Sequence, residues 1–128
     1  MKTGNSCLLD TSIIIHPFKN HAIAKQLNGF DELFVPSIAV GELFYGAYRS
    51  ENVQKHLDQV HLLLQDCKIL NPDTETAELY GRIKSALMGK GKPIPENDIW
   101  IAAIAIKYDL PLFTDDKHFK EIDGINLI

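Results

Sequence analysis

Four acidic residues lie within apolar stretches of the chain or at the border of one: Asp10, Glu42, Asp98 and Asp116. An isolated charge in an apolar segment costs free energy unless it is paired or binds a cation. If the fold brings all four into one cleft, their mutual repulsion must be relieved by a positive ion. A ligand set of carboxylates without His or Cys favours Mg²⁺ or Mn²⁺ over Zn²⁺.

Each acid also has a simpler interpretation when it is taken alone. Asp10 precedes Thr11 and Ser12 and could cap a helix. Asp98 could be a first-turn acid favoured by the helix dipole. Asp116 and its neighbour Asp115 could belong to an ordinary turn after Thr114. Glu42 is the hardest to explain in this way, because no basic residue lies within one helical turn of it.

The elements that must position these acids alternate between short strands and longer helices. Apolar runs predict strands over 7–9, 33–35, 68–70 and 110–113, with a fifth candidate over 126–128. Apolar spacing and capping residues predict helices over 22–27, 37–48, 52–66, 74–88 and 96–108, the last apolar nearly all round and therefore interior or at an interface between subunits. This order is typical of an α/β domain with a parallel sheet.

Such a sheet explains how the acids could meet. The carboxyl ends of parallel strands share one edge, where ligands bind. Asp10 and Asp116 follow predicted strands, whereas Glu42 lies one turn into a predicted helix and Asp98 lies at the start of another. A divalent ion held there could bind a phosphate, activate water and stabilise the leaving oxygen of a phosphodiester.

Composition limits the remaining possibilities. The chain has 128 residues, is 45% hydrophobic and has a formal net charge of −4, which is typical of one folded domain, 1–128, without a broad basic surface for nucleic acid. We expect no membrane span and no secretory signal, and therefore a cytoplasmic protein. Cys7 and Cys67 are expected to be buried free thiols rather than a disulfide.

Four segments together resemble the PIN-domain family and, within it, the VapC-like toxins of type II toxin–antitoxin systems. They are 8–15 (LLDTSIII), 36–47 (PSIAVGELFYGA), 97–105 (NDIWIAAIA) and 112–119 (LFTDDKHF). The resemblance covers essentially the whole chain. It implies a PIN-like three-layer α/β/α sandwich with a central, mainly parallel sheet of four to five strands.

The resemblance also implies an activity and a site. It implies Mg²⁺- or Mn²⁺-dependent hydrolysis of RNA by metal-activated water, leaving a 5′-phosphate and a 3′-hydroxyl. Asp10, Glu42, Asp98 and Asp116 occupy the family's acidic positions, with Asp115 as the alternative to Asp116. Thr11 or Ser12 and Thr114 match the hydroxyls that support the cluster, although each could instead cap its own helix. The implied partners are tRNA or rRNA as substrate, a small VapB-like antitoxin and a second copy of the chain.

Other functions stay open at this point. A catalytically silent PIN module would bind RNA or protein without cutting, but it would be free to lose the four acids. A phospho-receiver domain would have adjacent acids after its first strand and a Lys-Pro pair near its end, and the chain has neither. Lys90, Lys92 and His118 could contact RNA phosphates, but a solvated loop and a surface histidine are the simpler interpretations.

Overall fold

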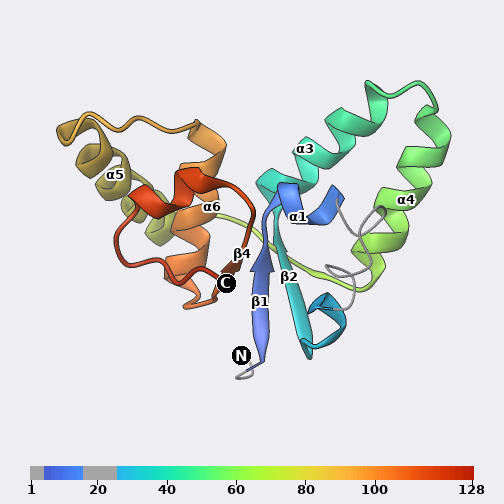
Figure 1. The fold of residues 1–128 in the computed structure, drawn as a ribbon, viewed down its shortest axis with the longest axis horizontal. Coiled ribbons are helices and arrows are strands. Elements are labelled where there is room, and N and C mark those ends of the chain that lie inside the picture. Colours follow the sequence, from blue (N-terminus) through green and yellow to red (C-terminus); the bar gives the residue numbers. More distant parts are fainter. Residues whose placement is uncertain (1–4, 16–25) are drawn as a thin grey trace.

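The computed structural model describes residues 5–15 and 26–128, and within them a four-stranded parallel sheet (Figure 1). The strands are β1 (Ser6–Leu9), β2 (Glu32–Pro36), β3 (Lys68–Leu70) and β4 (Leu112–Phe113), in the order β3-β2-β1-β4. The register pairs Leu8 of β1 with Phe34 on one side and with Leu112 on the other. β1 is therefore central, and its carboxyl end opens onto elements from both halves of the chain.

Helices connect the strands and pack against the sheet. They are α1 (Thr11–Ile15), α3 (Ser37–Tyr48), α4 (Val53–Gln65), α5 (Thr74–Gly89), α6 (Glu96–Lys107) and the short 3₁₀ helix η2 (Lys117–Glu121). Polar side chains fix several of their beginnings. The Asn52 side chain accepts a hydrogen bond from the Lys55 amide at the start of α4, and Asp73 accepts one from the Thr76 amide at the start of α5.

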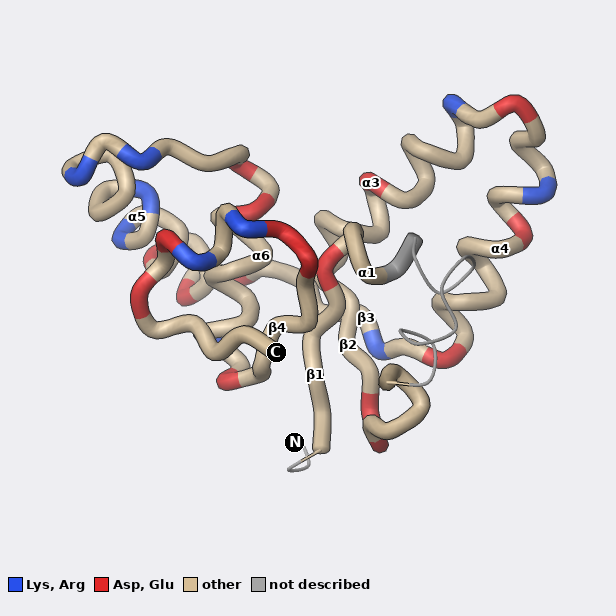
Figure 2. The backbone as a smooth tube through the Cα atoms, in the orientation of Figure 1, with Lys and Arg blue, Asp and Glu red and all other residues tan. Residues whose placement is uncertain are grey.

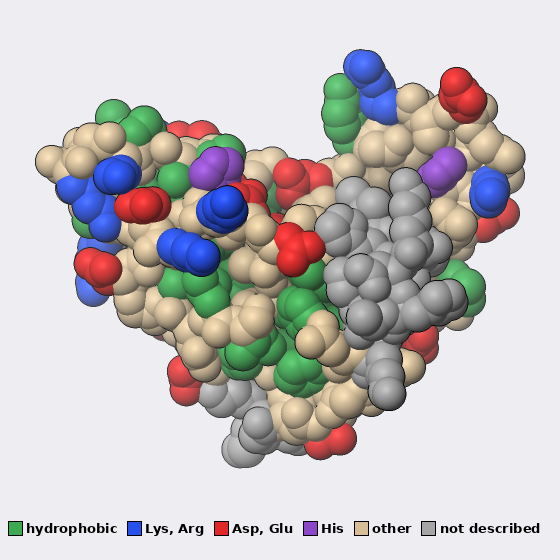
Figure 3. Space-filling view, in the orientation of Figure 1, with side chains coloured by type: hydrophobic (Ala, Val, Ile, Leu, Met, Phe, Trp, Pro, Cys, Tyr) green, Lys and Arg blue, Asp and Glu red, His purple; other side chains and the backbone are tan. Residues whose placement is uncertain are grey.

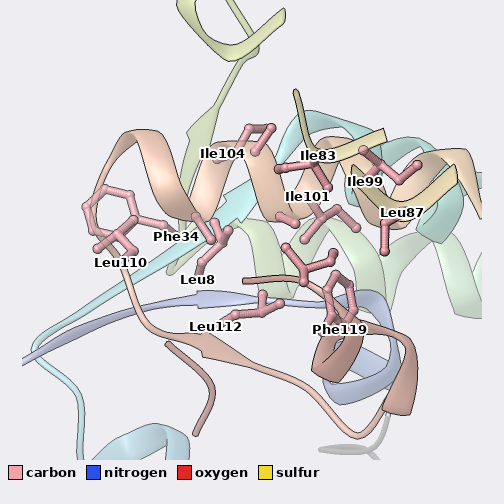
Figure 4. Packing of buried hydrophobic residues seen from close by; sticks show 14 residues of the cluster. Leu8, Phe34, Ile83, Leu87, Ile99, Ile101, Ile104, Leu110, Leu112 and Phe119 are labelled. Carbon is pink, nitrogen blue, oxygen red and sulfur yellow. The ribbon is translucent and has the colours of Figure 1, made fainter. Parts of the chain in front are cut away.

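Two hydrophobic clusters cover the two faces of the sheet, so the domain has three layers. Alternate strand residues point to opposite faces. Leu8 and Phe34 pack with α5, α6 and η2, as Figure 4 shows, whereas Leu9 and Val35 pack with α1, α3 and α4. In Figure 1 the two groups of helices lie on either side of the strands. The predicted α/β/α sandwich with a parallel sheet is confirmed.

Helix α6 lies in the interior, as its composition predicts. It has seven buried residues: Asp98, Ile99, Ile101, Ala102, Ala103, Ile104 and Ala105. Six of them are apolar and pack between the sheet and α5. The buried helix thus carries one acid, Asp98, at the end that lies nearest the carboxyl edge of the sheet.

The observed elements differ from the predicted ones at a few places. β4 begins at Leu112 rather than at residue 110, and the predicted fifth strand is reduced to one parallel bridge between Leu112 and Leu127. The 3₁₀ helix η2 was not predicted. Cys67 is only half-buried, while Cys7 is buried, and both thiols are free. The helix predicted over 22–27 lies largely outside the described residues.

No described helix is long and apolar enough to cross a membrane.

Candidate active site

The four predicted acids gather at the carboxyl edge of the sheet, where Figure 2 shows acidic positions above β1 and β4. Asp10 follows β1 directly, and Asp116 lies three residues after β4. Glu42 comes from α3 and Asp98 from the first turn of α6. A cleft lined by Glu42, Pro95, Glu96, Asn97, Asp98 and Asp116 opens there, in the hollow between the two lobes of Figure 3.

Asp10 is buried and held by three donors. The Thr114 hydroxyl donates to Asp10 Oδ2 at 2.7 Å, and the Ser12 hydroxyl donates to the same oxygen at 3.0 Å. The Thr11 amide donates to Asp10 Oδ1 at 2.8 Å. These three bonds fix the orientation of the carboxylate. Asp10 therefore interacts with the start of α1, as the capping interpretation expects, and also with Thr114 beyond β4.

Glu42 is tied to the same centre through Thr11. The Thr11 hydroxyl donates to Glu42 Oε1 at 2.7 Å, so one residue contacts both Asp10 and Glu42. This bond connects the end of β1 to α3, although Thr11 and Glu42 lie 31 residues apart in sequence. The resemblance implied Thr11 or Ser12, together with Thr114, as supporting hydroxyls, and in the structure all three donate to an acid of the site.

Asp98, Asp116 and His118 form the second part of the centre. The His118 Nδ1 atom lies 3.1 Å from Asp98 Oδ2 and 3.0 Å from Asp116 Oδ1. One ligand atom from each of the three residues lies within 4.8 Å of the others. Asp116 also begins η2, because its carboxylate accepts a hydrogen bond from the His118 amide at 2.9 Å. The start of η2 therefore brings the imidazole to both carboxylates.

The surroundings of Asp98 disfavour a negative charge on its carboxyl group. Burial of the Asp98 carboxyl, followed by repulsion from Asp116, raises the pKa of Asp98 to about 6, with Asp10 adding a smaller repulsion. The contact with His118 opposes this shift. The neighbouring carboxyl groups in turn raise the pKa of His118. A cation bound beside Asp98 and Asp116 would offset this cost of negative charge.

The residues present fit a divalent ion. Carboxylate oxygens from separate elements face one cleft, and Thr11, Ser12 and Thr114 hold two of the carboxylates. Oxygen-rich sets of this kind suit hard ions such as Mg²⁺ and Mn²⁺. Hydrogen bonds that orient the ligands are a general feature of metal sites. The donor set therefore agrees with the chemistry predicted from the sequence.

The geometry distinguishes Asp115 from Asp116. The Asp116 carboxylate lines the cleft and contacts His118. Asp115 instead donates its backbone amide to the Ser12 hydroxyl at 3.3 Å. The Thr114 hydroxyl accepts from the Asp116 amide at 2.9 Å, which directs the chain after β4 toward the cleft. Asp116 is therefore the residue whose position matches a fourth acid of the site.

Sequence reasoning missed two features of the cleft. His118 was interpreted as a surface side chain, and although it is half-exposed it contacts two of the acids. Glu96 is a further carboxylate in the cleft, paired with Lys84 and Tyr80 of α5. The signal for His118 was its place two residues after Asp116. The signal for Glu96 was its place two residues before Asp98, but its partners lie on another helix.

The fold and site define a recognisable class of protein. The PIN domain family model matches residues 7–125, and the chain belongs to the PIN-domain family.

Several relatives within this family carry the VapC name. Ribonuclease VapC1 of Haemophilus influenzae (strain R2866) is 33% identical over 124 residues, which cover 92% of each chain. The tRNA(fMet)-specific endonuclease VapC of Salmonella typhimurium is 31% identical over 124 residues and 94% of each chain. The similarity of this chain to VapC-like proteins, first indicated by four sequence segments, thus extends over nearly the full length.

Solved structures agree with this assignment. VapBC-1 from nontypeable Haemophilus influenzae superposes with a TM-score of 0.88 at 31% identity, covering 96% of each chain. The DNA-bound VapBC complex from Salmonella typhimurium superposes with a TM-score of 0.89 at 30% identity, covering 96% of each chain. Both neighbours were solved as VapBC complexes, and both share the fold described above.

Proposed function

We propose that this protein is a metal-dependent endoribonuclease and the toxin of a VapBC-type toxin–antitoxin pair. The observation that supports this most directly is the cleft at the carboxyl edge of the sheet, which Glu42, Asp98 and Asp116 line together. The relatives named as VapC ribonucleases, one of them a tRNA(fMet)-specific endonuclease, support RNA as the substrate. A tRNA or an rRNA is the class of substrate that we propose.

In this proposal Asp10, Glu42, Asp98 and Asp116 hold Mg²⁺ or Mn²⁺. The bound ion would supply an activated water and charge stabilisation at the scissile phosphate. The Thr114 and Ser12 hydroxyls keep the Asp10 carboxylate turned toward the site. The Thr11 hydroxyl holds the Glu42 carboxylate in place. The chain thus contributes ligands and their orientation, and the products are a 5′-phosphate and a 3′-hydroxyl.

The proposed partners follow from the same relatives. Their structures were solved as VapBC complexes, so we propose that a small VapB-like antitoxin binds this chain. We also propose a homodimer. Tyr45 and Tyr48 of α3 are about two-thirds exposed, as a protein interface on that helix would require.

The experiment that tests the activity is cleavage of a mixed tRNA and rRNA pool by the purified protein. Reactions contain Mg²⁺, Mn²⁺ or EDTA, and the protein is wild type, Asp98→Asn or Asp58→Asn. The last variant is the matched control, because Asp58 is an exposed residue of α4. We expect metal-dependent cutting by the wild type and by Asp58→Asn, and a loss of at least a hundredfold with Asp98→Asn.

Two outcomes would contradict the proposal. Cutting that persists in EDTA would remove the metal from the mechanism. Cutting that survives Asp98→Asn would place the activity elsewhere or in a contaminant. If no RNA is cut, titration with Mn²⁺ distinguishes a nuclease whose substrate is absent from the pool from a catalytically silent module. Binding that Asp98→Asn abolishes supports the metal centre, and no binding at all rejects it.

A further inference from the structure

We propose that His118 is a nitrogen ligand of the divalent ion, and that it makes the site prefer Mn²⁺ to Mg²⁺. This inference rests on the proposed metal-dependent function and goes beyond the four acids that the sequence pattern identifies. The starting observation is that the His118 ring reaches both Asp98 and Asp116 with the same atom, Nδ1.

Two of the three separations between the donor atoms match those of neighbouring ligands on one octahedral ion. Neighbouring ligands about 2.1 Å from an octahedral ion lie about 3.0 Å from each other, and opposite ligands lie about 4.2 Å apart. Nδ1 lies 3.1 Å from Asp98 Oδ2 and 3.0 Å from Asp116 Oδ1, and all three atoms lie within 4.8 Å of one another. The Nδ1 atom is thus as close to each carboxylate as two ligands of one ion would be.

The backbone holds the imidazole at this place. The His118 amide donates to Asp116 Oδ1 at 2.9 Å, which sets the first residues of η2. The next residue, Phe119, has no exposed surface and packs with Leu8 and Leu112 in the cluster under α6. In the sequence, His118 thus lies between Asp116, a proposed metal ligand, and Phe119, a core residue. These neighbours hold the imidazole in place before a metal binds.

A nitrogen ligand changes which ion the site favours. Mg²⁺ takes oxygen ligands and keeps much of its water, whereas divalent ions of the first transition row, of which Mn²⁺ is one, also bind nitrogen ligands. Mn²⁺ accepts both carboxylate and imidazole. Replacement of His118 by an oxygen-donor side chain should therefore weaken Mn²⁺ binding more than Mg²⁺ binding. A ring that only donates a hydrogen bond to Asp98 would not produce this difference.

The direct test is pulsed electron paramagnetic resonance of Mn²⁺ bound to the intact protein. We expect modulation from a directly bound ¹⁴N nucleus, replaced by the ¹⁵N pattern when all histidines are ¹⁵N-labelled. His118→Gln should lose this coupling. The matched control is His56→Gln, because His56 is exposed on α4 and contacts the Asn52 carbonyl oxygen instead. The control should keep the coupling unchanged.

Calorimetry adds a second readout. In His118→Gln we expect the Kd for Mn²⁺ to rise at least tenfold and the Kd for Mg²⁺ to change less than about threefold. Circular dichroism checks that the variant is folded, and the labelling experiment on the unaltered protein needs no substitution at all. Wild-type protein that binds Mn²⁺ without a nitrogen coupling overturns the inference, and so does an equal loss of affinity for both ions.

These outcomes are separable from a failure of the proposed function. If RNA is cut in a metal-dependent way but no nitrogen coupling is found, the nuclease proposal stands and the role of His118 is rejected. If Mn²⁺ does not bind and RNA is not cut, both are rejected.

Discussion

At the scale of single residues, Asp98 imposes a cost on the metal-free protein. Its pKa is raised to about 6 by burial and by Asp116, whereas an aspartate in an unfolded chain titrates near ~3.9. Between these two pH values the folded state holds a proton that the unfolded state has released. The free energy of unfolding contributed by Asp98 therefore falls as the pH rises from about 4 to about 6, and stays low above that.

Removal of this charge should stabilise the metal-free protein. At pH 7 in EDTA, we expect Asp98→Asn to raise the free energy of unfolding by on the order of 1 kcal/mol. Near pH 4 the wild-type carboxyl is protonated, so the gain should disappear. Urea denaturation at the two pH values measures both. A variant less stable than wild type at pH 7 would contradict the assigned cost.

Thr114 is predicted to matter through its hydroxyl, because this group donates to Asp10 Oδ2 and accepts from the Asp116 amide. Thr114→Val keeps the shape of the side chain and removes both bonds. We expect Mn²⁺ affinity to fall roughly 10- to 100-fold, as for other groups that orient metal ligands. Thr74→Val, at an exposed position of α5, is the matched control and should bind Mn²⁺ as the wild type does. Equal affinity of Thr114→Val and wild type would show that the hydroxyl is dispensable.

At the scale of elements, η2 couples the core to the site. Phe119 is completely buried, and the two preceding residues in the site, Asp116 and His118, depend on the placement of this short helix. Phe119→Ala should cost about 3–5 kcal/mol of stability and weaken Mn²⁺ binding together with it. Phe119→Leu should cost less and retain the metal site. Chemical denaturation and calorimetry on both variants test this link.

An exposed residue provides the control for that experiment. Leu62 on α4 is 63% exposed, so Leu62→Ala should change neither stability nor metal binding measurably. If Phe119→Ala lowers stability but leaves the Mn²⁺ affinity of the folded protein unchanged, η2 does not position the site.

The elements show where sequence reasoning succeeds and where it stops. The 37–48 helix and the 68–70 strand were predicted with the bounds that the structure has, because Pro36 and Asn71 mark their limits clearly. The predicted fifth strand failed, since only Leu127 pairs with Leu112. Short segments of this kind depend on tertiary contacts rather than on their own apolar pattern.

The candidate site, too, was predicted from the sequence only in part. The four acids were found because each lies within an apolar segment or borders one, which is visible in the sequence. His118 was missed as a member of the cluster, because a histidine near an aspartate is common on surfaces and only the fold shows that Asp98 completes the group. The resemblance implied Thr11 or Ser12 as a supporting hydroxyl, but only the fold shows that Thr11 contacts Glu42, 31 residues away.

At the scale of the whole molecule, the net charge of −4 limits how RNA can be held. Each phosphate neutralised by Lys or Arg releases counterions and steepens the salt dependence of binding. With acids lining the cleft, we expect metal-free protein to bind RNA weakly, with a slope of log K against log salt smaller than about 4 in magnitude. Filter binding at several salt concentrations in EDTA measures the slope. A steep slope would reveal a basic surface that the acidic cleft does not provide.

The narrow pairing of β4 with β1 has a dynamic consequence. Only two residues of each strand are in register, and the Asp10 amide donates to the Phe113 carbonyl at 3.1 Å just beyond them. Brief separation of β4 would carry Asp116 and His118 away from Asp10 and expose this amide to solvent. A metal ion bound by Asp10 on one side and by Asp116 and His118 on the other would oppose this separation. The rate of hydrogen exchange at the Asp10 amide therefore reports how often β4 separates from β1, and Mn²⁺ should slow this exchange.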